Sequence, residues 1–246
     1  SANDGERRIL GRRAGKSEVQ SVVSRAKKAG INNISLDVML GVPGQTKESL
    51  KSTLDFCISS GVPHLSCYIL KIEENTPFFR MRDKLPFPSD DDTADMYLFM
   101  CEYLEEHGIM QYEISNFAVP GFESRHNLKY WHDEEYLGIG ASAHSFLGGK
   151  RTYYPRDIEY FISGNERLTE GDGGDEEEFC MLALRLREGL TQERFYARFH
   201  HEIPQKMLES AKQYEKYGLC RCESGGISLT RRGFLLSNSV ISEIIL

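Results

Sequence analysis

The sequence lacks any apolar run long enough to span a bilayer, and its first residues carry no signal-peptide pattern. It therefore predicts no membrane span within these residues. Basic residues are also in the minority, with 30 Lys and Arg against 37 Asp and Glu, which gives a net charge of −7. This balance argues against a general affinity for nucleic acid or for anionic membranes.

Cysteine is sparse, with six residues in 246 and no spacing typical of a disulfide framework. The first three, Cys57, Cys67 and Cys101, fall within apolar helix or strand patterns, where a reduced thiol behaves as a small hydrophobe. Cys220 and Cys222 are the only close pair, and no second pair accompanies them to make a zinc motif. This usage predicts a reducing, cytoplasmic compartment.

A strand before the first helix is also missing. The predicted helix Ser17–Ala29 feeds the apolar strand Asn33–Leu40, but no strand precedes it, and the chain does not begin with Met. In an alternating α/β fold each crossover helix joins two neighbouring parallel strands. We therefore expect the strand that feeds this helix to lie outside this chain.

What is present is a repeat of helix and strand. Strands are predicted at residues 33–40, 64–70 and 110–117. Ser17 with Gln20 resembles a capping box for the first helix, and Thr46 and Ser89 are the expected N-caps of the next two. The spacing predicts a parallel βα array, in which three strands are too few to close a barrel.

The second half of the chain has a different pattern. Residues 118–147 are rich in glycine and aromatic residues and predict a loop, followed by a short helix near 155–163 and an acidic linker at 170–178. Three helices, a hairpin and a last helix then predict a winged-helix-like module. From Glu176 onward ten Lys and Arg face ten Asp and Glu, which favours a structural or partner-docking role over nucleic-acid binding.

Two charged residues stand out near the start. Asp37 lies in an apolar strand, where a carboxylate is costly unless it is paired or contacts a ligand. A ligand contact and an internal salt bridge with a neighbouring strand are both consistent with this pattern. Arg12, just before the first helix, reads alone as an ordinary surface residue. The turn at residues 41–46 admits either close approach to a ligand or a plain βα connection.

The densest group of chemically useful side chains is residues 126–131, His-Asn-Leu-Lys-Tyr-Trp, which contains the only Trp of the chain. His126 and Tyr130 are four residues apart, so a helical turn would place them on one face. A neutral imidazole is a good ligand for haem iron, and aromatic rings pack on a flat macrocycle. The alternative is a core histidine bonded to Asn127 or to backbone, with Trp131 as packing. His132 and His144 are further candidates.

Four stretches of the sequence, taken together and in order, are similar to one protein family. They cover residues 33–46, 111–118, 123–131 and 136–146. They resemble the HemW group of radical S-adenosylmethionine proteins, which are close relatives of oxygen-independent coproporphyrinogen III oxidase. The resemblance extends over essentially the whole chain.

The resemblance implies an α/β fold, made of the later half of a partial (βα) radical-SAM barrel and a small winged-helix-like α+β domain. The barrel part would cover residues 1–169 and the small domain residues 170–246. In the family a [4Fe–4S] cluster is held on a Cys-x3-Cys-x2-Cys loop near the start of the barrel. No three of the six cysteines have this spacing, so the cluster is expected only in a longer parent protein.

The resemblance also assigns candidate site residues. Arg12 matches the Arg of a Leu-Gly-Arg motif, and Asp37 matches a strand Asp, both of which contact S-adenosylmethionine in the family. The His-Asn-x-x-Tyr-Trp string is associated with haem binding in the haem chaperones of the group. It implies a haem site at His126, Asn127, Tyr130 and Trp131, with His126 as the iron ligand.

The function implied for the parent is that of a haem chaperone, which binds haem and passes it to acceptor proteins. The alternative is an enzyme that oxidatively decarboxylates coproporphyrinogen III to protoporphyrinogen IX. Without the cluster, this chain is expected to run no radical chemistry and to bind S-adenosylmethionine weakly or not at all. An uncovered barrel edge would favour a homodimer.

Overall fold

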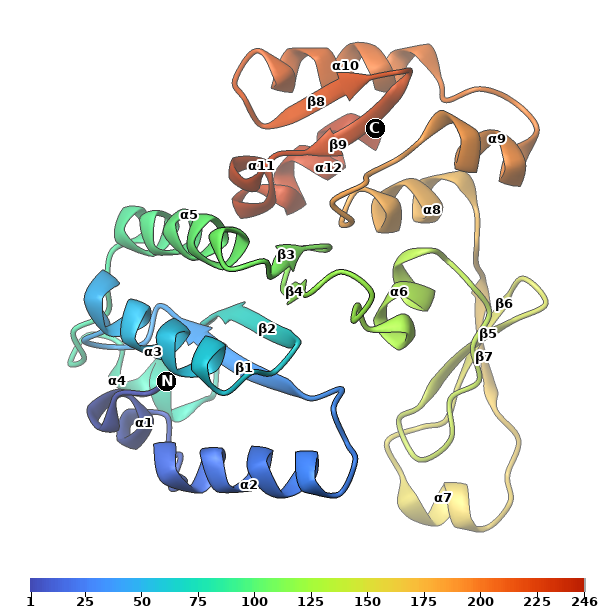
Figure 1. The fold of residues 1–246 in the computed structure, drawn as a ribbon. Helices are drawn as coiled ribbons and strands as arrows, with labels where there is room; N and C mark the ends of the chain where they lie inside the picture. The colour runs from blue at the N-terminus through green and yellow to red at the C-terminus, as the bar shows by residue number, and fades with distance from the viewer. Residues whose placement is uncertain (246) are drawn as a thin grey trace. The chain divides into compact units, whose positions relative to one another are not determined.

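A computed structural model describes residues 1–245, and Figure 1 shows its helices and strands. By the packing of its backbone the chain divides into two compact units, Ser1–Glu123 and Ser124–Leu246. The predicted boundary between residues 169 and 170 lies inside the second unit and stays a prediction. None of the described helices combines the length and the apolar character needed to cross a membrane.

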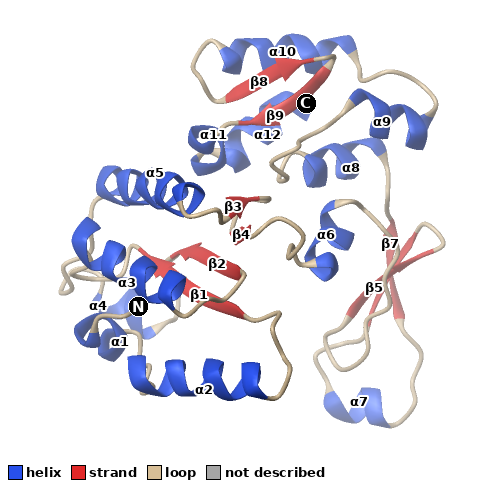
Figure 2. Ribbon diagram, viewed as in Figure 1, coloured by secondary structure: helices blue, strands red, loops and turns tan. Residues whose placement is uncertain are grey.

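The first unit is a four-stranded sheet with helices packed on it (Figure 2). Its elements are α1 (Asp4–Ile9), α2 (Lys16–Lys28), β1 (Ser35–Leu40), α3 (Lys47–Ser59), β2 (His64–Ile69), α4 (Pro77–Met81), α5 (Asp90–Glu106), β3 (Met110–Gln111) and β4 (Asn116–Ala118).

The strand order of this sheet is β1-β2-β4-β3, and only β1 and β2 run parallel, with Asp37 opposite Ser66. β4 is antiparallel to β2, and β3 is antiparallel to β4. The prediction of a third parallel strand over residues 110–117 is therefore wrong. This segment folds back on itself because Glu113 accepts a hydrogen bond from the Asn116 amide and closes a turn between β3 and β4.

The core of the first unit lies where α3 and α5 pack on β1. Buried apolar side chains from the three elements meet there, among them Val38, Leu40, Leu50, Leu54, Met100 and Leu104. Thr46 and Ser89 cap α3 and α5 as predicted, and each side chain accepts the backbone N–H three residues further on. Satisfied helix starts and apolar faces together explain why these two helices form.

The start of α2 differs from the prediction. Gly15 occupies the N-cap, and its N–H donates to the Glu18 carboxylate at 2.9 Å. The Ser17 hydroxyl donates to the same carboxylate instead of capping the helix. The predicted Ser17–Gln20 capping box is wrong, because a carboxylate is the favoured acceptor at the positive end of a helix.

The second unit contains one helix that precedes a three-stranded antiparallel sheet, and then a C-terminal module. Its elements are α6 (Arg125–Trp131), β5 (His144–Leu147), β6 (Lys150–Tyr153), α7 (Ile158–Ile162), β7 (Leu168–Asp172), α8 (Glu176–Ala183), α9 (Gln192–Phe199), α10 (Gln205–Glu215), β8 (Cys220–Glu223), β9 (Gly226–Leu229), α11 (Arg231–Leu235) and α12 (Ser237–Ile245).

Two predictions for this unit are wrong. The predicted loop at 118–147 contains α6 and β5, and the predicted linker at 170–178 instead supplies the end of β7 and the start of α8. β7 forms because its residues pair with β6 across the small sheet, where Lys150 and Asp172 make an ion pair between the two strands. Exposed charges on paired strands gave this segment the composition of a linker.

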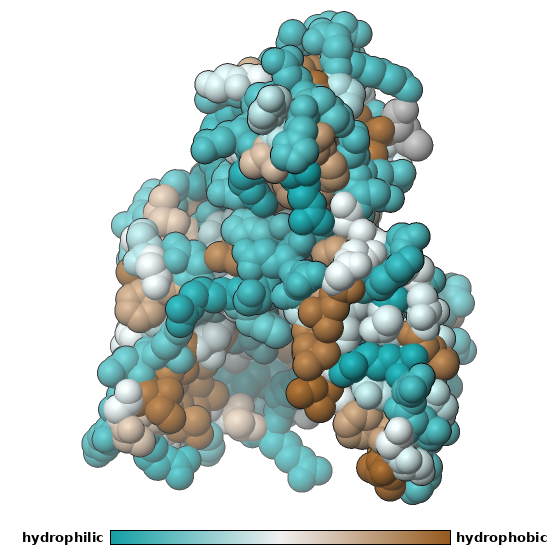
Figure 3. All heavy atoms as spheres, turned by 90° about the vertical axis from the view of Figure 1, so that its right-hand side faces the viewer, coloured by the Kyte–Doolittle hydropathy of each residue, from teal (hydrophilic) through white to brown (hydrophobic). Residues whose placement is uncertain are grey.

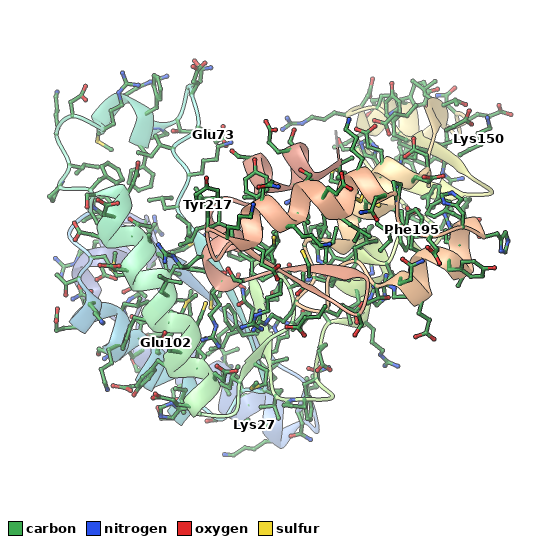
Figure 4. All side chains as sticks on the ribbon, turned by 90° about the horizontal axis from the view of Figure 1, so that it is seen from above. Lys27, Glu73, Glu102, Lys150, Phe195 and Tyr217 are labelled. Carbon is green, nitrogen blue, oxygen red and sulfur yellow. The ribbon has the colours of Figure 1, made fainter. Side chains whose placement is uncertain are left out.

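The C-terminal module contains the helices and the β8–β9 hairpin that were predicted. Asp175 caps α8 by accepting the Glu178 N–H at 2.8 Å, but the Glu178 side chain accepts from Gly174, so only half of the predicted capping box forms. Phe195, labelled on α9 in Figure 4, lies with its ring centroid 4.9 Å from that of Phe199 in a cluster of aromatic side chains.

Candidate functional site

Arg12 and Asp37 line one cavity of about 570 Å³ in the first unit. Asp37 lies on β1, and Arg12 lies in the loop that joins α1 to α2. The cavity also has apolar lining residues, among them Leu10, Val19, Leu36, Met39 and Phe56. The fold therefore brings the two predicted S-adenosylmethionine contacts to one hollow, although their contact with that molecule stays a prediction.

The alternative for Asp37, an internal salt bridge, finds no support among residues 1–245. Its side chain is exposed, and no cation of the described chain pairs with it. Its side chain instead lines the cavity described above. A carboxylate in this position is free to accept hydrogen bonds from a ligand.

The turn that follows β1 is held by residues that the sequence analysis did not single out. Glu6 of α1 is buried, and it accepts a hydrogen bond from the Ser49 hydroxyl at 2.5 Å and one from the Gln45 amide at 3.3 Å. Gln45 also donates to the Met39 carbonyl at 2.9 Å. These bonds favour the interpretation of residues 41–46 as a structural turn.

A second polar group was also missed. His64 bonds through Nδ1 to the Ser35 hydroxyl at 2.7 Å and through Nε2 to the Tyr112 hydroxyl at 2.8 Å. Burial lowers the pKa of His64. A neutral imidazole donates at one ring nitrogen and accepts at the other, so this buried ring has both of its hydrogen bonds. The group ties the β3–β4 hairpin to β2 and β1.

In the second unit the predicted haem motif forms the helix α6. Ser124 caps it by accepting the Asn127 N–H at 3.3 Å. His126 and Tyr130 lie on one face, with Nε2 and the phenol oxygen 3.2 Å apart and the rings edge to face at 5.0 Å. His126 is exposed and bonds to Tyr130, so the alternative of a core histidine bonded to Asn127 or to backbone is wrong.

The other two histidine candidates are engaged by carboxylates. His132 lies 3.3 Å from Glu188, and His144 lies 3.1 Å from Glu170. His126 has no carboxylate within ion-pair distance among the described residues. Of the three imidazoles, that of His126 is therefore the one most open to a new ligand.

The remaining motif residues flank this imidazole. Asn127 and Trp131 are half-buried, and the Trp131 ring centroid lies 5.8 Å from the guanidinium carbon of Arg185. The Tyr130 ring packs edge to face on Tyr136 at 4.5 Å. α6 thus presents an imidazole beside the Tyr130 ring, which in turn packs on Tyr136.

Apolar side chains are also exposed in the second unit. Figure 3 shows apolar patches, in brown, on the side that carries β5–β7 and α7 in Figure 1. Exposed apolar residues of this unit include Leu137, Ile139, Ile158 and Ile162. Exposed apolar surface of this kind often marks a binding surface for a ligand or a partner.

The chain offers no ligand set for an iron–sulfur cluster in its described part. Among residues 1–245 no group of three or more His, Cys, Asp or Glu side chains is placed to hold a metal ion. Five of the six cysteines are buried in the described chain, and none belongs to such a group. The donor set therefore does not fit a [4Fe–4S] cluster.

Comparison with known proteins places the chain beside two kinds of protein. Residues 176–236 match the family model of the HemN C-terminal domain. The chain is 34% identical over 248 residues to the heme chaperone HemW of Bacillus subtilis and 34% identical over 246 residues to that of Lactococcus lactis. Each alignment covers 96% of this chain and 65% of the relative, so the chain spans less than two thirds of their length.

The fold is similar to that of a solved coproporphyrinogen III oxidase, HemN of Escherichia coli, which is described as a radical SAM enzyme. The TM-score is 0.77 at 18% identity, and the match covers 98% of this chain and 61% of that one. This likeness confirms the predicted fold class and shows the fold alone. The sequence matches show that the chain is related to the HemW heme chaperones, and residues 176–236 match the HemN C-terminal domain.

Proposed function

We propose that this protein binds haem at α6 and passes it to acceptor proteins, as a haem chaperone. Two relatives that match 96% of the chain at 34% identity carry this name. The observation that carries the proposal is the exposed His126, whose ring bonds to Tyr130 rather than to a carboxylate.

The chemistry of α6 suits this cargo. The His126 imidazole would supply an axial nitrogen to the haem iron, and the rings of Tyr130 and Trp131 would pack against the macrocycle. Because the helix is exposed, haem would sit at the surface and stay accessible to an acceptor. Such a site favours exchange over permanent retention.

A haemin titration followed by absorption spectroscopy tests the proposal. We expect the wild-type chain to bind haemin and His126→Ala to bind it at least about tenfold more weakly, because the iron loses its protein ligand. His144→Ala is the matched control, since His144 is also exposed but bonds to Glu170. Equal binding by wild type and His126→Ala would contradict the proposal.

Transfer is tested separately with the haem-loaded chain and an acceptor haemoprotein in its apo form. We expect the haem spectrum to shift from that of the donor to that of the acceptor. Retention of haem by the donor in the presence of excess acceptor would rule out a chaperone role.

Decarboxylation of coproporphyrinogen III stays the alternative for a longer parent protein, since the fold resembles that of the oxidase. Turnover of coproporphyrinogen by the reconstituted full-length protein would favour this enzyme. Haem binding that disappears in His126→Ala, without any turnover, would favour the chaperone.

We extend the proposal to the cavity of the first unit, where Arg12 and Asp37 would contact S-adenosylmethionine in the full-length protein. The Arg12 guanidinium is suited to the carboxylate of that molecule, and the Asp37 carboxylate is suited to its hydroxyl or amino groups. For the present chain we expect weak binding or none by calorimetry. Micromolar affinity would overturn this expectation.

We also propose self-association through β1. This strand has a paired neighbour on one side, and a free strand edge presents backbone groups that a second copy could pair with. Analytical ultracentrifugation should then detect a dimer, whereas a monomer at all concentrations would contradict the proposal.

A further inference from the structure

The end of α6 is held by the C-terminal module. The Trp131 ring faces the guanidinium of Arg185, and the next residue, His132, lies 3.3 Å from the Glu188 carboxylate. Both partners lie within residues 176–236, the segment that matches the HemN C-terminal domain. Two consecutive side chains of the helix end therefore contact the same module.

The third residue in this series is Asp133, and its side chain has no exposed surface. Its carboxylate accepts from Arg198 of α9 at 3.0 Å and from Arg151 of β6 at 3.4 Å. Arg151 also pairs with Glu178 of α8 at 2.6 Å. One buried carboxylate thus joins α6, the small sheet and the C-terminal module.

The backbone at Asp133 is specialised as well. Its φ of +54° lies in the left-handed region, which few residues other than Gly, Asn and Asp adopt readily. A buried carboxylate is stable only when cations and hydrogen bonds replace the water that it loses. The two guanidinium groups do this, so the chain direction after α6 is fixed by charge pairing.

The other end of α6 is built differently. No residue of the helix is buried, and His126 near its start is exposed. A helix of seven residues without buried side chains has little stability of its own. Its position therefore depends on the contacts at Trp131, His132 and Asp133, together with the packing of Tyr130 on Tyr136.

We propose that the C-terminal module holds α6 in the position that haem binding requires. Asp133 is the residue that positions this helix. This inference rests on the proposed function of α6. A metal ligand works best when the groups behind it fix its orientation, and loss of such groups commonly lowers metal affinity about 10- to 100-fold. The module of residues 176–236 is then part of haem binding and not only a surface for acceptor proteins.

The test compares haemin titrations of the full chain carrying His126, with and without Asp133→Asn. We expect Asp133→Asn to bind haemin about tenfold more weakly or worse, with an absorption spectrum of mixed axial ligation. The matched control is Asp172→Asn, which removes an exposed, ion-paired carboxylate of the same unit. It should leave both affinity and spectrum unchanged.

A second pair of variants covers the case in which Asp133→Asn fails to fold. Arg198 is 40% exposed, so Arg198→Gln should fold and still lose the cation that pairs with the Asp133 carboxylate. Arg198→Lys keeps a cation and should restore the wild-type spectrum. A loss of haemin affinity and a mixed spectrum in Arg198→Gln, recovered in Arg198→Lys, would support the inference.

The outcomes separate this inference from the function on which it rests. Wild-type haemin affinity and spectrum in both Asp133→Asn and Arg198→Gln, with binding lost in His126→Ala, would overturn the inference and leave the proposed function standing. Failure of the wild-type chain to bind haemin would overturn both.

Discussion

Helices α3 and α6 are held in opposite ways. α3 buries Leu50, Thr53, Leu54 and Cys57 against the sheet of the first unit. α6 buries none of its residues, and charged side chains at its end fix its place in the second unit. Apolar burial is roughly proportional to area and needs no direction, whereas an ion pair sets a position.

The difference bears on where a ligand can bind. A helix that is stabilised by its buried face has no side chains left for a bulky cargo on that face. α6 has no fully buried residue and keeps the side chain of His126 exposed, at a cost in stability. If this difference is general, the first unit should lose most stability when a buried apolar side chain is removed. The second unit should be sensitive to changes at specific close contacts.

The largest effect is expected in the core of the first unit. Leu54→Ala removes a side chain that is fully buried between α3 and the sheet. We expect the free energy of unfolding to fall by about 2–5 kcal/mol, measured by urea denaturation. Val22→Ala on the exposed face of α2 should change it little. Equal losses in the two variants would show that apolar burial does not dominate the stability of the first unit.

In the second unit a glycine is expected to matter nearly as much. Gly189 has φ +75°, and a Cβ there would lie 2.2 Å from the Ile227 carbonyl oxygen of the hairpin. Backbone strain alone should lower the free energy of unfolding by about 1–3 kcal/mol. We expect Gly189→Ala to lower it further, as measured by urea denaturation, because of the added clash. Gly164→Ala isolates that strain, since Gly164 has φ +74° and no atom near a Cβ. A Gly189→Ala that is no worse than Gly164→Ala would show that the close approach is unimportant.

Helix caps provide a smaller and more symmetrical test. Thr46 caps α3 in the first unit, and Asp175 caps α8 in the second. Each Ala substitution should lower the free energy of unfolding by about 0.5–2 kcal/mol in thermal or urea melts. Similar losses of stability in the two variants would show that N-capping contributes equally in both units. The difference between the units would then lie in the packing of their helices.

The elements predicted well from sequence are those with a local signal. Thr46 and Ser89 each precede a run of apolar residues at helical spacing, and α3 and α5 follow them as expected. His126 and Tyr130 share a helix face because a four-residue spacing is a property of the helix itself. Such signals need no knowledge of the rest of the fold.

The elements that were missed depend on distant partners. β7 is a strand because it pairs with β6, although most of its residues lack apolar side chains and are exposed. Glu6 bonds to a serine 43 residues away, and Asp133 pairs with an arginine 65 residues away. A single sequence does not show which charges meet, so the shared face of His126 and Tyr130 could be predicted, but not the groups that hold α6 in place.

Two histidines should give the units opposite responses to pH, and this is the smallest effect that we expect. Burial lowers the pKa of His64 below its ordinary value of 6.5. In the second unit the ring nitrogens of His201 donate to the Glu202 carbonyl and to the Glu176 carboxylate, which raises the pKa of His201 above 6.5. The folded state therefore resists protonation at one site and favours it at the other.

The direction of each effect follows from which state binds the proton. Below pH 6.5 the unfolded chain protonates at His64 more readily than the folded one, so stability falls as the pH drops. At His201 the stabilisation is complete below pH 6.5 and is lost as the pH rises through its raised pKa. Urea midpoints should be measured between about pH 5 and pH 8. As the pH falls, the midpoint should drop less in His64→Gln than in the wild type. As the pH rises, it should drop less in His201→Gln than in the wild type. If both variants shifted the pH profile in the same direction, the buried network of the first unit and the surface pair of the second would not differ as the structure indicates.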